Sequence, residues 1–325
     1  MISFFANLFG YILNFLYEFI GNYGLAIILF SILVKIIMLP ISIKQQKTME
    51  KSQKLNGEMK QIQFKYKNDP EKMNQEVMEL YKREKLSPFS GCFSAIVQIV
   101  LLFSVFYLVR SPLTYMKKVD TNIIEKMEQV VLEDGKTSGY KEIAVINYIN
   151  SLEKQDEEKV NNENSGSDNQ NQENAETENK DQESKEETFN INDYKDQAYI
   201  NMDFLGLDLS KVPTEDLGDF KVLIIPILYV ISSFISMKMT TIQTKSKKDE
   251  KLLGDGKDKE EEYDPMEQAN KSMSWFMPLM SVSIACIAPL GLALYWLVNN
   301  ILMIFERLFL NKFFKSEKEE AKKNA

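Results

Sequence analysis

The sequence predicts an all-α membrane protein with five transmembrane helices, a cytoplasmic helical hairpin and an N-terminal interfacial helix. Three observations predict this class: long apolar runs, their separation from charged segments, and an uneven distribution of lysine. Over all 325 residues, the mean hydropathy of −0.26 and the formal net charge of −8 resemble those of a soluble protein. These averages mislead, because long apolar and very polar stretches cancel each other.

Five apolar segments are predicted to span the membrane, since a helix needs about 20 mostly apolar residues to cross a bilayer. In chain order they are residues 23–43, 88–110, 220–239, 272–288 and 289–310. The last two are expected to form a tight hairpin, because Pro289 and Gly291 punctuate them. A single helix over both would be too long for a bilayer. Structural or turn roles are also expected for Pro40, Pro88 and Gly91.

Residues 1–22 are apolar but carry a polar stripe. Polar or small residues recur every three or four positions, at Ser3, Asn7, Gly10, Asn14 and Glu18. This spacing places them on one face of a helix, which is typical of a helix lying at the membrane surface. No lysine or arginine precedes Lys35, so an ordinary signal peptide is not indicated. We expect an interfacial amphipathic helix, with an additional span as the alternative.

The distribution of positive charge predicts the orientation. Residues 44–87 contain 11 Lys or Arg against 7 acids, whereas residues 1–34 contain no cationic side chain. The positive-inside rule then places the N-terminus outside and residues 44–87 in the cytoplasm. With five spans, the loop 111–219 lies outside, and the loop 240–271 and the tail 311–325 lie inside.

Residues 44–87 are predicted to form a helical hairpin. Good helix formers fill both arms, and Asn68-Asp69-Pro70 separates them, with Asp69 as N-cap and Pro70 at the first helical position. Apolar side chains such as Met59 and Leu80 are expected to pack between the two arms and hold them together. The alternative is that some methionines form an adaptable docking face.

The outside loop 111–219 holds 11 Lys against 26 acids, a net charge of −15. Its centre, 153–188, has no aromatic residue and cannot bury enough apolar surface to fold, so we expect it to be disordered. The flanking stretches 120–152 and 194–209 hold enough Ile, Val and Tyr for short helices. A metal site has little support here, since no spaced ligand loop is visible.

The composition argues against an enzyme. The chain contains no histidine, which removes the commonest general base and the commonest zinc ligand. Cys92 and Cys286 lie in apolar runs and are expected to be small buried residues. No nucleotide-binding motif occurs. We expect no catalysis, no cofactor, no metal and no sequence recognition of nucleic acids.

Lys35 is the most informative residue. It lies about eight residues from the cytoplasmic end of the first span, which is a depth of about 12 Å. A cation at that depth is costly unless it meets water or a partner. It either snorkels to the inner interface or lines a wet cavity, and physics alone leaves the two equal. Glu18 and Glu306 are placed at interfaces, so no carboxylate is expected in the core of a span. The other candidate lining residues are Ser31, Gln98, Ser233, Tyr295 and Asn299.

Six stretches of the chain together carry a family resemblance. They are residues 24–29 followed by Lys35 and Leu39-Pro40, residues 67–72, residues 78–82, Pro88 with Gly91-Cys92 and residues 96–98, residues 204–210, and residues 289–296. In this order they resemble the YidC/Oxa/Alb family of membrane protein insertases. Each motif is modest alone, and the combination is specific. The resemblance covers all but the centre of the acidic loop and the tail.

The resemblance implies a hydrophilic groove among five helices, open to the cytoplasm and the lipid but closed outside. The groove cation, Lys35 here, would attract acidic residues of a nascent chain, whose apolar helix would enter lipid along the third and fifth spans. The implied location is the bacterial plasma membrane. The implied partners are nascent membrane proteins, the lipid bilayer and, weakly through the tail, the ribosome. The resemblance leaves open whether a Sec translocon and a signal-recognition receptor take part.

Two features depart from the family pattern. The family usually has arginine where this chain has Lys35, and lysine lacks the bidentate fork that clamps anions. The outside loop is also longer and more acidic than expected. The competing hypotheses are a small-solute transporter or channel subunit, for which no internal repeat is evident, and a non-catalytic membrane scaffold.

Overall fold

The computed structural model describes residues 2–84, 90–135, 138–164, 189–245, 280 and 282–323. The described part is almost entirely helical. Its long helices are α1 (Ile2–Ile20), α2 (Tyr23–Lys65), α3 (Pro70–Arg83), α4 (Ser90–Arg110), α5 (Thr121–Glu133), α6 (Lys141–Asn164), α8 (Ile224–Lys245) and α10 (Leu290–Lys323). The short elements are the π-helix η1 (Leu113–Lys117), the helical turns η2 (Ile191–Tyr194), α7 (Lys195–Ala198) and η3 (Phe220–Leu223), and the strands β1 (Asp203–Phe204) and β2 (Leu207–Asp208).

Four described helices are long and apolar enough to cross a membrane, so the chain is a multi-pass helical membrane protein. They cover Ile2–Ile20, Tyr23–Thr48, Phe220–Met239 and Leu290–Leu310. Helix α4 adds a shorter apolar stretch, Ile96–Arg110. The predicted span 272–288 lies mainly outside the described residues. Within this span, the described residues 280 and 282–287 are helical. The count of five spans therefore stays a prediction.

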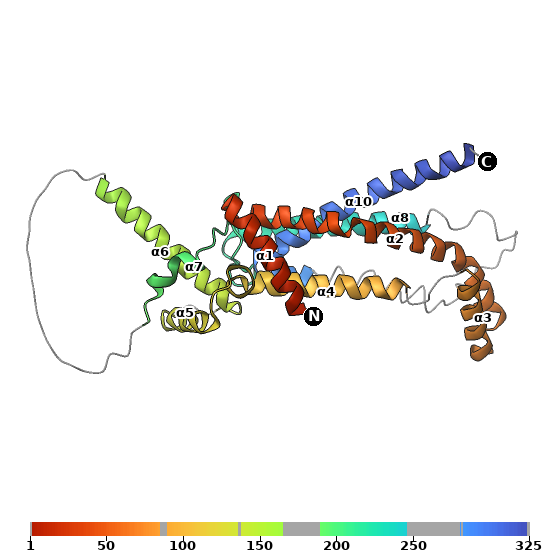
Figure 1. The fold of residues 1–325 in the computed structure, drawn as a ribbon, viewed down its shortest axis with the longest axis horizontal. Coiled ribbons are helices and arrows are strands. Elements are labelled where there is room, and N and C mark those ends of the chain that lie inside the picture. The colour runs from red at the N-terminus through yellow and green to blue at the C-terminus, as the bar shows by residue number, and fades with distance from the viewer. Residues whose placement is uncertain are drawn as a thin grey trace, which may run out of the picture.

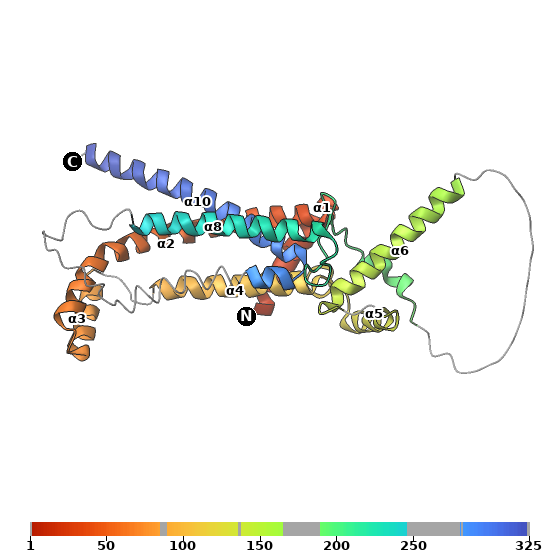
Figure 2. The same cartoon turned by 180° about the vertical axis from the view of Figure 1, so that it is seen from behind.

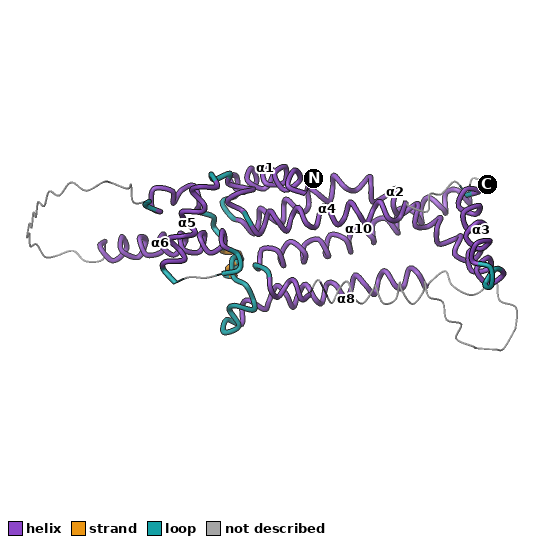
Figure 3. The backbone as a smooth tube through the Cα atoms, turned by 90° about the horizontal axis from the view of Figure 1, so that it is seen from below, coloured by secondary structure: helices purple, strands orange, loops and turns teal. Residues whose placement is uncertain are grey.

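The long helices form a bundle with two different ends. In Figures 1 and 2, α2, α8 and α10 run in one direction and α4 runs in the other. One end carries α5, α6 and α7 and is called the loop end; the other carries α3 and the C-terminus and is called the hairpin end. Figure 3 shows α10 between α8 and the pair formed by α2 and α4. Helix α10 is thus the central element of the bundle.

Helix α3 folds back along the end of α2 (Figure 1). The side chain of Asp69 accepts a hydrogen bond from Lys72 N at 3.1 Å and Pro70 opens the helix, which confirms the predicted cap. Tyr66 donates to Glu76 across the turn at 3.1 Å, and Arg83 pairs with Glu58. Leu55 and Leu80 are the buried apolar residues of this region among those described. Polar ties therefore supplement the predicted apolar contact between the arms.

Helix α1 runs obliquely across α2 and α4 rather than along them (Figure 1). It packs closely against η1, because a Cβ at Gly10 would overlap the backbone carbonyl of Tyr115. Lys117 pairs with Glu18 at 2.7 Å, and its Nζ lies 4.8 Å from the centre of the Tyr17 ring. A glycine is required at this crossing, since any side chain would separate the two helices.

A loop at residues 199–214 ties the helices together at the loop end. Tyr23 N donates to Asn201 O at 3.1 Å, which joins the loop to the start of α2. Leu290 N donates to Lys211 O and Gly291 N donates to Leu209 O, both at 2.9 Å, which joins it to the start of α10. These carbonyls satisfy N–H groups that a helix N-terminus cannot pair internally. The loop thereby closes this end of the bundle with backbone hydrogen bonds.

Buried residues concentrate toward the loop end of each long helix. They run from Tyr23 to Ser31 on α2, from Ser104 to Val109 on α4, and from Leu290 to Trp296 on α10. Large apolar side chains are exposed along the whole length of these helices, including Leu25, Leu29, Ile227 and Leu228 toward the loop end and Ile36, Ile37, Ile41, Ile96, Ile99, Phe103, Phe234, Ile235, Phe305, Leu308 and Phe309 toward the hairpin end. The buried core of the long helices therefore lies mainly at the loop end.

Two elements differ from the sequence prediction. Helix α2 continues through Pro40 to Lys65, so the predicted first span and the first arm of the predicted hairpin form one helix. Proline inside a membrane helix is tolerated because local adjustments satisfy the carbonyl that it frees. Helix α6 continues to Asn164, into the segment predicted to be disordered from residue 153. Glu, Lys and Gln are good helix formers, so the helix propagates from its packed first half. Residues 165–188 lie outside the described part.

Candidate functional site

Polar side chains gather on the two sides of α10, where it packs against α2 and against α8. We call this set the polar cluster; its members are Ser31, Lys35, Ser232, Ser233, Ser236, Asn299, Asn300, Glu306 and Arg307. The cluster starts where the apolar core of the loop end stops, since Tyr23 to Phe30 and Leu290 to Trp296 precede it on α2 and α10. Polar groups inside membrane helices usually face a bundle interior or a cavity and mark function.

The cluster centres on an ion pair between α2 and α10. Nζ of Lys35 lies 2.7 Å from Oε2 of Glu306, and the two side chains are 26% and 10% exposed. The sequence places Glu306 at an interface and gives no sign of this pairing. The largely buried side chain of Glu306 is the partner of the deep lysine.

The position of the pair shows how the two helices bring it together. The rings of Phe30 and Tyr295 lie 6.5 Å apart, on the same two helices. From there, Lys35 is five residues further along α2, about 7.5 Å, and Glu306 is eleven residues further along α10, about 16.5 Å. The helices run in the same direction, so Lys35 starts nearer the loop end than Glu306, and the two long side chains bridge this difference.

Further polar contacts join α8 to α10. Asn300 donates to Ser233 Oγ at 2.7 Å and, more weakly, to Ser232 Oγ at 3.4 Å. Arg307 donates from Nη1 to the backbone carbonyl of Ser236 at 3.1 Å. Amide and guanidinium groups that form such interhelical hydrogen bonds help to hold two helices together within a membrane.

The predicted site residues fall into different environments. Ser31 is 1% exposed and donates to Ile27 O at 2.8 Å, so its hydroxyl satisfies its own helix one turn before Lys35. Tyr295 is buried against Phe30 and shares a side-chain hydrogen bond with Asn299. Gln98 is exposed on α4. Lys35 lies at the contact between α2 and α10, and Ser233 lies at the contact between α8 and α10.

Sequence reasoning missed Glu306 and Arg307 as members of the cluster. A signal for Glu306 was present, because positions 295, 299, 302 and 306 fall on one face of a helix at spacings of three and four. Glu306 therefore shares the face of Tyr295 and Asn299. Its placement at an interface left this periodicity unused.

The residues predicted as turns are placed as follows. Pro289 is buried between the helical residues 282–287 and α10, and Gly291 lies in the first turn of α10. A Cβ at Gly291 would make ordinary contacts of 3.4 Å or more with Tyr23, Val109 and Ile27. Gly91 is helical in the first turn of α4, and Pro88 lies outside the described residues.

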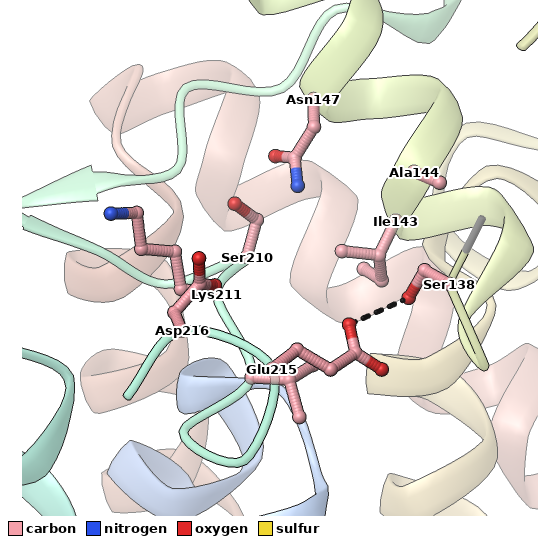
Figure 4. A pocket seen from close by; sticks show the side chains of 9 residues that line it. Ser138, Ile143, Ala144, Asn147, Ser210, Lys211, Glu215 and Asp216 are labelled. Carbon is pink, nitrogen blue, oxygen red and sulfur yellow. Dashed lines mark hydrogen bonds between the residues drawn. The ribbon is translucent and has the colours of Figure 1, made fainter. Parts of the chain in front are cut away.

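A separate hollow of about 180 Å³ lies at the loop end, far from the polar cluster along the bundle. Figure 4 shows it between α6 and the loop that carries Ser210 and Glu215, with Ser138 donating to Glu215 at 3.3 Å. Beside it, Lys211 pairs with Asp219 at 2.9 Å, which raises the pKa of Lys211 and lowers that of Asp219. Of its charged lining residues, Lys211 and Glu215 are engaged within the protein. Among the described residues, no group of three His, Cys, Asp or Glu could hold a metal ion.

The fold and the cluster together define a class of protein: a multi-pass helical membrane protein that is packed at one end and carries a buried ion pair toward the other. The family model described as "60Kd inner membrane protein" matches residues 15–319, and the chain belongs to that family. The resemblance to the YidC/Oxa/Alb family, based on the six sequence stretches, is thereby confirmed.

Several curated proteins are similar to the chain, and those compared here are each named "Membrane protein insertase YidC". The Fusobacterium nucleatum protein is 41% identical over 102 residues, which are 31% of this chain and 50% of the relative. The Rickettsia felis protein is 24% identical over 303 residues, 93% of this chain and 38% of the relative. The Helicobacter pylori protein is 42% identical over 106 residues, 33% of this chain and 19% of the relative. The matches span half or less of the length of these relatives.

Proposed function

We propose that the protein is a membrane protein insertase that receives apolar nascent segments and passes them into the bilayer. The observation that carries the proposal is the asymmetric packing of the bundle. Its helices close tightly at the loop end, while ionic and amide groups gather toward the hairpin end. This arrangement offers polar groups to a client from one side only. The name of the relatives, membrane protein insertase, supports the same function.

The hairpin end is proposed to face the cytoplasm. Residues 44–87, which form the end of α2 and α3, carry 11 Lys or Arg against 7 acids, and the positive-inside rule assigns such a segment to the inside. The loop 199–214 then seals the outside by its backbone hydrogen bonds to α2 and α10. The N-terminus is outside and the C-terminus is inside, in the plasma membrane of a bacterium.

Helix α1 is proposed to lie at the outer interface instead of spanning. Its length and composition would allow it to span, yet it crosses the bundle obliquely. Its polar side is engaged, since Glu18 pairs with Lys117 and Asn7 accepts from Lys118. Phe4, Phe15 and Phe19 are exposed on its other faces, where they would enter the acyl region.

In the proposed mechanism, the helical hairpin receives the client and the polar cluster lowers the cost of moving its polar segment. A cation in low-dielectric surroundings attracts an acidic side chain more strongly than it would in water. The apolar helix of the client then leaves along α8 and α10, whose exposed Phe234, Phe305 and Phe309 contact lipid. The groove residues in this proposal are Ser31, Lys35, Gln98, Ser233, Tyr295 and Asn299, together with Glu306 because it pairs with Lys35.

The partners are nascent membrane proteins and the lipid bilayer. The helical extension of α10 as far as Lys323 is proposed to contact the ribosome weakly, since residues 311–325 carry only 5 Lys and 3 Glu. Action beside a Sec translocon and a signal-recognition receptor is a further proposal, which crosslinking to each partner in membranes tests.

The function is tested by complementation of an insertase-depleted bacterium. The wild-type chain and Lys35→Arg are expected to restore growth, whereas Lys35→Glu is expected to fail for clients with acidic translocated segments, because it places two carboxylates together. Lys35→Gln serves as the matched neutral control, with membrane levels of each variant checked by immunoblot. Failure of the wild-type chain to restore client insertion would contradict the proposal. Normal growth with Lys35→Glu would remove its electrostatic part.

The competing transporter or channel function predicts a path open to both sides. The backbone hydrogen bonds of the loop 199–214 argue against such a path at the loop end. A flux assay in liposomes distinguishes the two, because an insertase should release no small solute. Harmless Lys35 variants together with intact client insertion would instead favour the scaffold hypothesis.

A further inference from the structure

Glu306 is held in the polar cluster by one of its oxygens. Its Oε2 lies 2.7 Å from Lys35 Nζ, while its buried Oε1 has no hydrogen-bond partner among the described residues. The Glu306 side chain is 10% exposed and the Lys35 side chain is 26% exposed. The carboxylate thus occupies one of the three donors of the ammonium, and part of the lysine remains accessible.

Such a pair is suited to exchange. A buried carboxylate with one unpaired oxygen has lost hydrogen bonds to water that the protein does not replace, which weakens its hold relative to a fully bonded pair. Lysine is a compact cation without the fork that fixes a carboxylate in one geometry, so a second carboxylate can take its place. The next residue along α10 is Arg307, whose guanidinium is anchored to Ser236 O at 3.1 Å and interacts electrostatically with Glu306. A released Glu306 would therefore still have a cation beside it.

We propose that Glu306 is an internal counter-ion that determines client specificity: it occupies, at Lys35, the place that a carboxylate of an acidic client segment takes during insertion. This inference rests on the proposed insertase function. Because Glu306 already neutralises Lys35, a client carboxylate exchanges with another carboxylate instead of meeting an uncompensated cation. The groove then discriminates weakly between acidic and neutral clients.

Crosslinking in proteoliposomes tests the inference with the full chain. A photoreactive residue replaces Met38, which lies three residues beyond Lys35 and so on the same face of α2. Two matched single-span clients are supplied, one with two aspartates in its short translocated segment and one with two asparagines there. Glu306→Gln keeps the size of the side chain and removes its charge. It is expected to raise the ratio of aspartate to asparagine client crosslinks about tenfold, within the usual range of coupling between two sites.

Control variants separate the charge of Glu306 from its structural role. Lys35→Gln combined with Glu306→Gln removes the cation as well, and the two clients should then crosslink equally. If Glu306→Gln does not fold, two variants that carry the lysine at position 306 supply the test. Lys35→Gln/Glu306→Lys has an unpaired lysine, whereas Lys35→Glu/Glu306→Lys keeps the ion pair with its charges exchanged. The ratio of aspartate to asparagine client crosslinks should be higher for the first variant than for the second. An unchanged or lowered ratio in these comparisons would overturn the inference. If the wild-type protein inserts neither client, the proposed function itself fails, which is a different outcome.

Discussion

Replacing Gly24 with alanine should loosen the seal at the loop end. Gly24 is in the first turn of α2, directly beneath the strand β1. A Cβ added there would lie 2.5 Å from Cγ and 2.7 Å from Cβ of Phe204. Phe204 cannot simply move, because Asn22 donates to Asp203 O at 2.6 Å and the chain then turns through Leu205 and Gly206 at φ values of 55° and 76°. Either α2 or this strand must shift.

The size of the effect follows from two opposing terms. Forcing an extra methyl group into a packed site typically costs about 1–3 kcal/mol. Alanine in a helix gains about 0.5–1 kcal/mol over glycine. The net loss therefore lies between about 0 and 2.5 kcal/mol, and its central value of about 1 kcal/mol would lower a thermal midpoint by roughly 2–4 °C. Gly57→Ala is the matched control, since Gly57 is in the same helix and nothing lies within 4 Å of its added Cβ. It should raise the midpoint slightly.

Thermal unfolding in detergent at one fixed scan rate measures the difference, because unfolding of such proteins is often irreversible. Adding Phe204→Ala should relieve the clash, so Gly24→Ala should lower the thermal midpoint less in the Phe204→Ala background than in the wild type. The difference between the two effects is the interaction energy of a double-mutant cycle. A midpoint for Gly24→Ala that equals or exceeds that of Gly57→Ala would refute the packing argument. The packing argument would also be refuted if Gly24→Ala lowered the thermal midpoint equally in the wild-type and Phe204→Ala backgrounds.

Three further predictions concern the other contacts. Gly10→Ala should destabilise the packing of α1 on η1, since its Cβ would overlap the Tyr115 carbonyl, and protease cleavage near residue 20 should become faster in detergent. Asn300→Ala should lower the thermal midpoint by the equivalent of about 0.6–1.7 kcal/mol through loss of the contact with Ser233, and Ser233→Ala in that background should add little. Burial raises the pKa of Glu142, although hydrogen bonds from Thr114 oppose the shift. The folded state therefore binds the proton more tightly, and this stabilisation is complete below the ordinary pKa and lost as pH rises through the raised value. The wild type should gain stability relative to Glu142→Gln as pH falls from 7, and a constant difference in thermal midpoint would contradict this.

The sequence predicted those features that depend on length and composition. The helices α2, α4, α8 and α10 correspond to apolar runs of sufficient length, because a bilayer imposes a minimum on a spanning helix. The cap at Asp69 also followed from local rules, since a side-chain acceptor before a proline at the first helical position is favoured whatever the surroundings. Lys35 stood out by its cost in lipid alone.

The features that depend on tertiary contact were less accessible. The pairing of Lys35 with Glu306 required the relative rotation and stagger of α2 and α10, which no single segment encodes. The loop 199–214 gives few local signals, and its role follows from the carbonyls that it offers to the start of α10. The extension of α6 into the acidic segment reflects propagation from packed residues such as Ile146 and Ile149, which outweighs a composition typical of disorder.

Accessibility of position 35 from each side of the membrane tests the central claim most directly. Cys92 and Cys286 are first replaced by serine, and a cysteine is then introduced by Lys35→Cys or, as a control at the same depth, by Ile36→Cys, whose parent side chain is apolar and 65% exposed. A charged methanethiosulfonate reagent modifies only thiols that water can ionise. The account predicts that Lys35→Cys reacts in inverted vesicles and is protected in right-side-out cells, while Ile36→Cys reacts in neither. Reaction of Lys35→Cys from the outside, or in neither preparation, would contradict it.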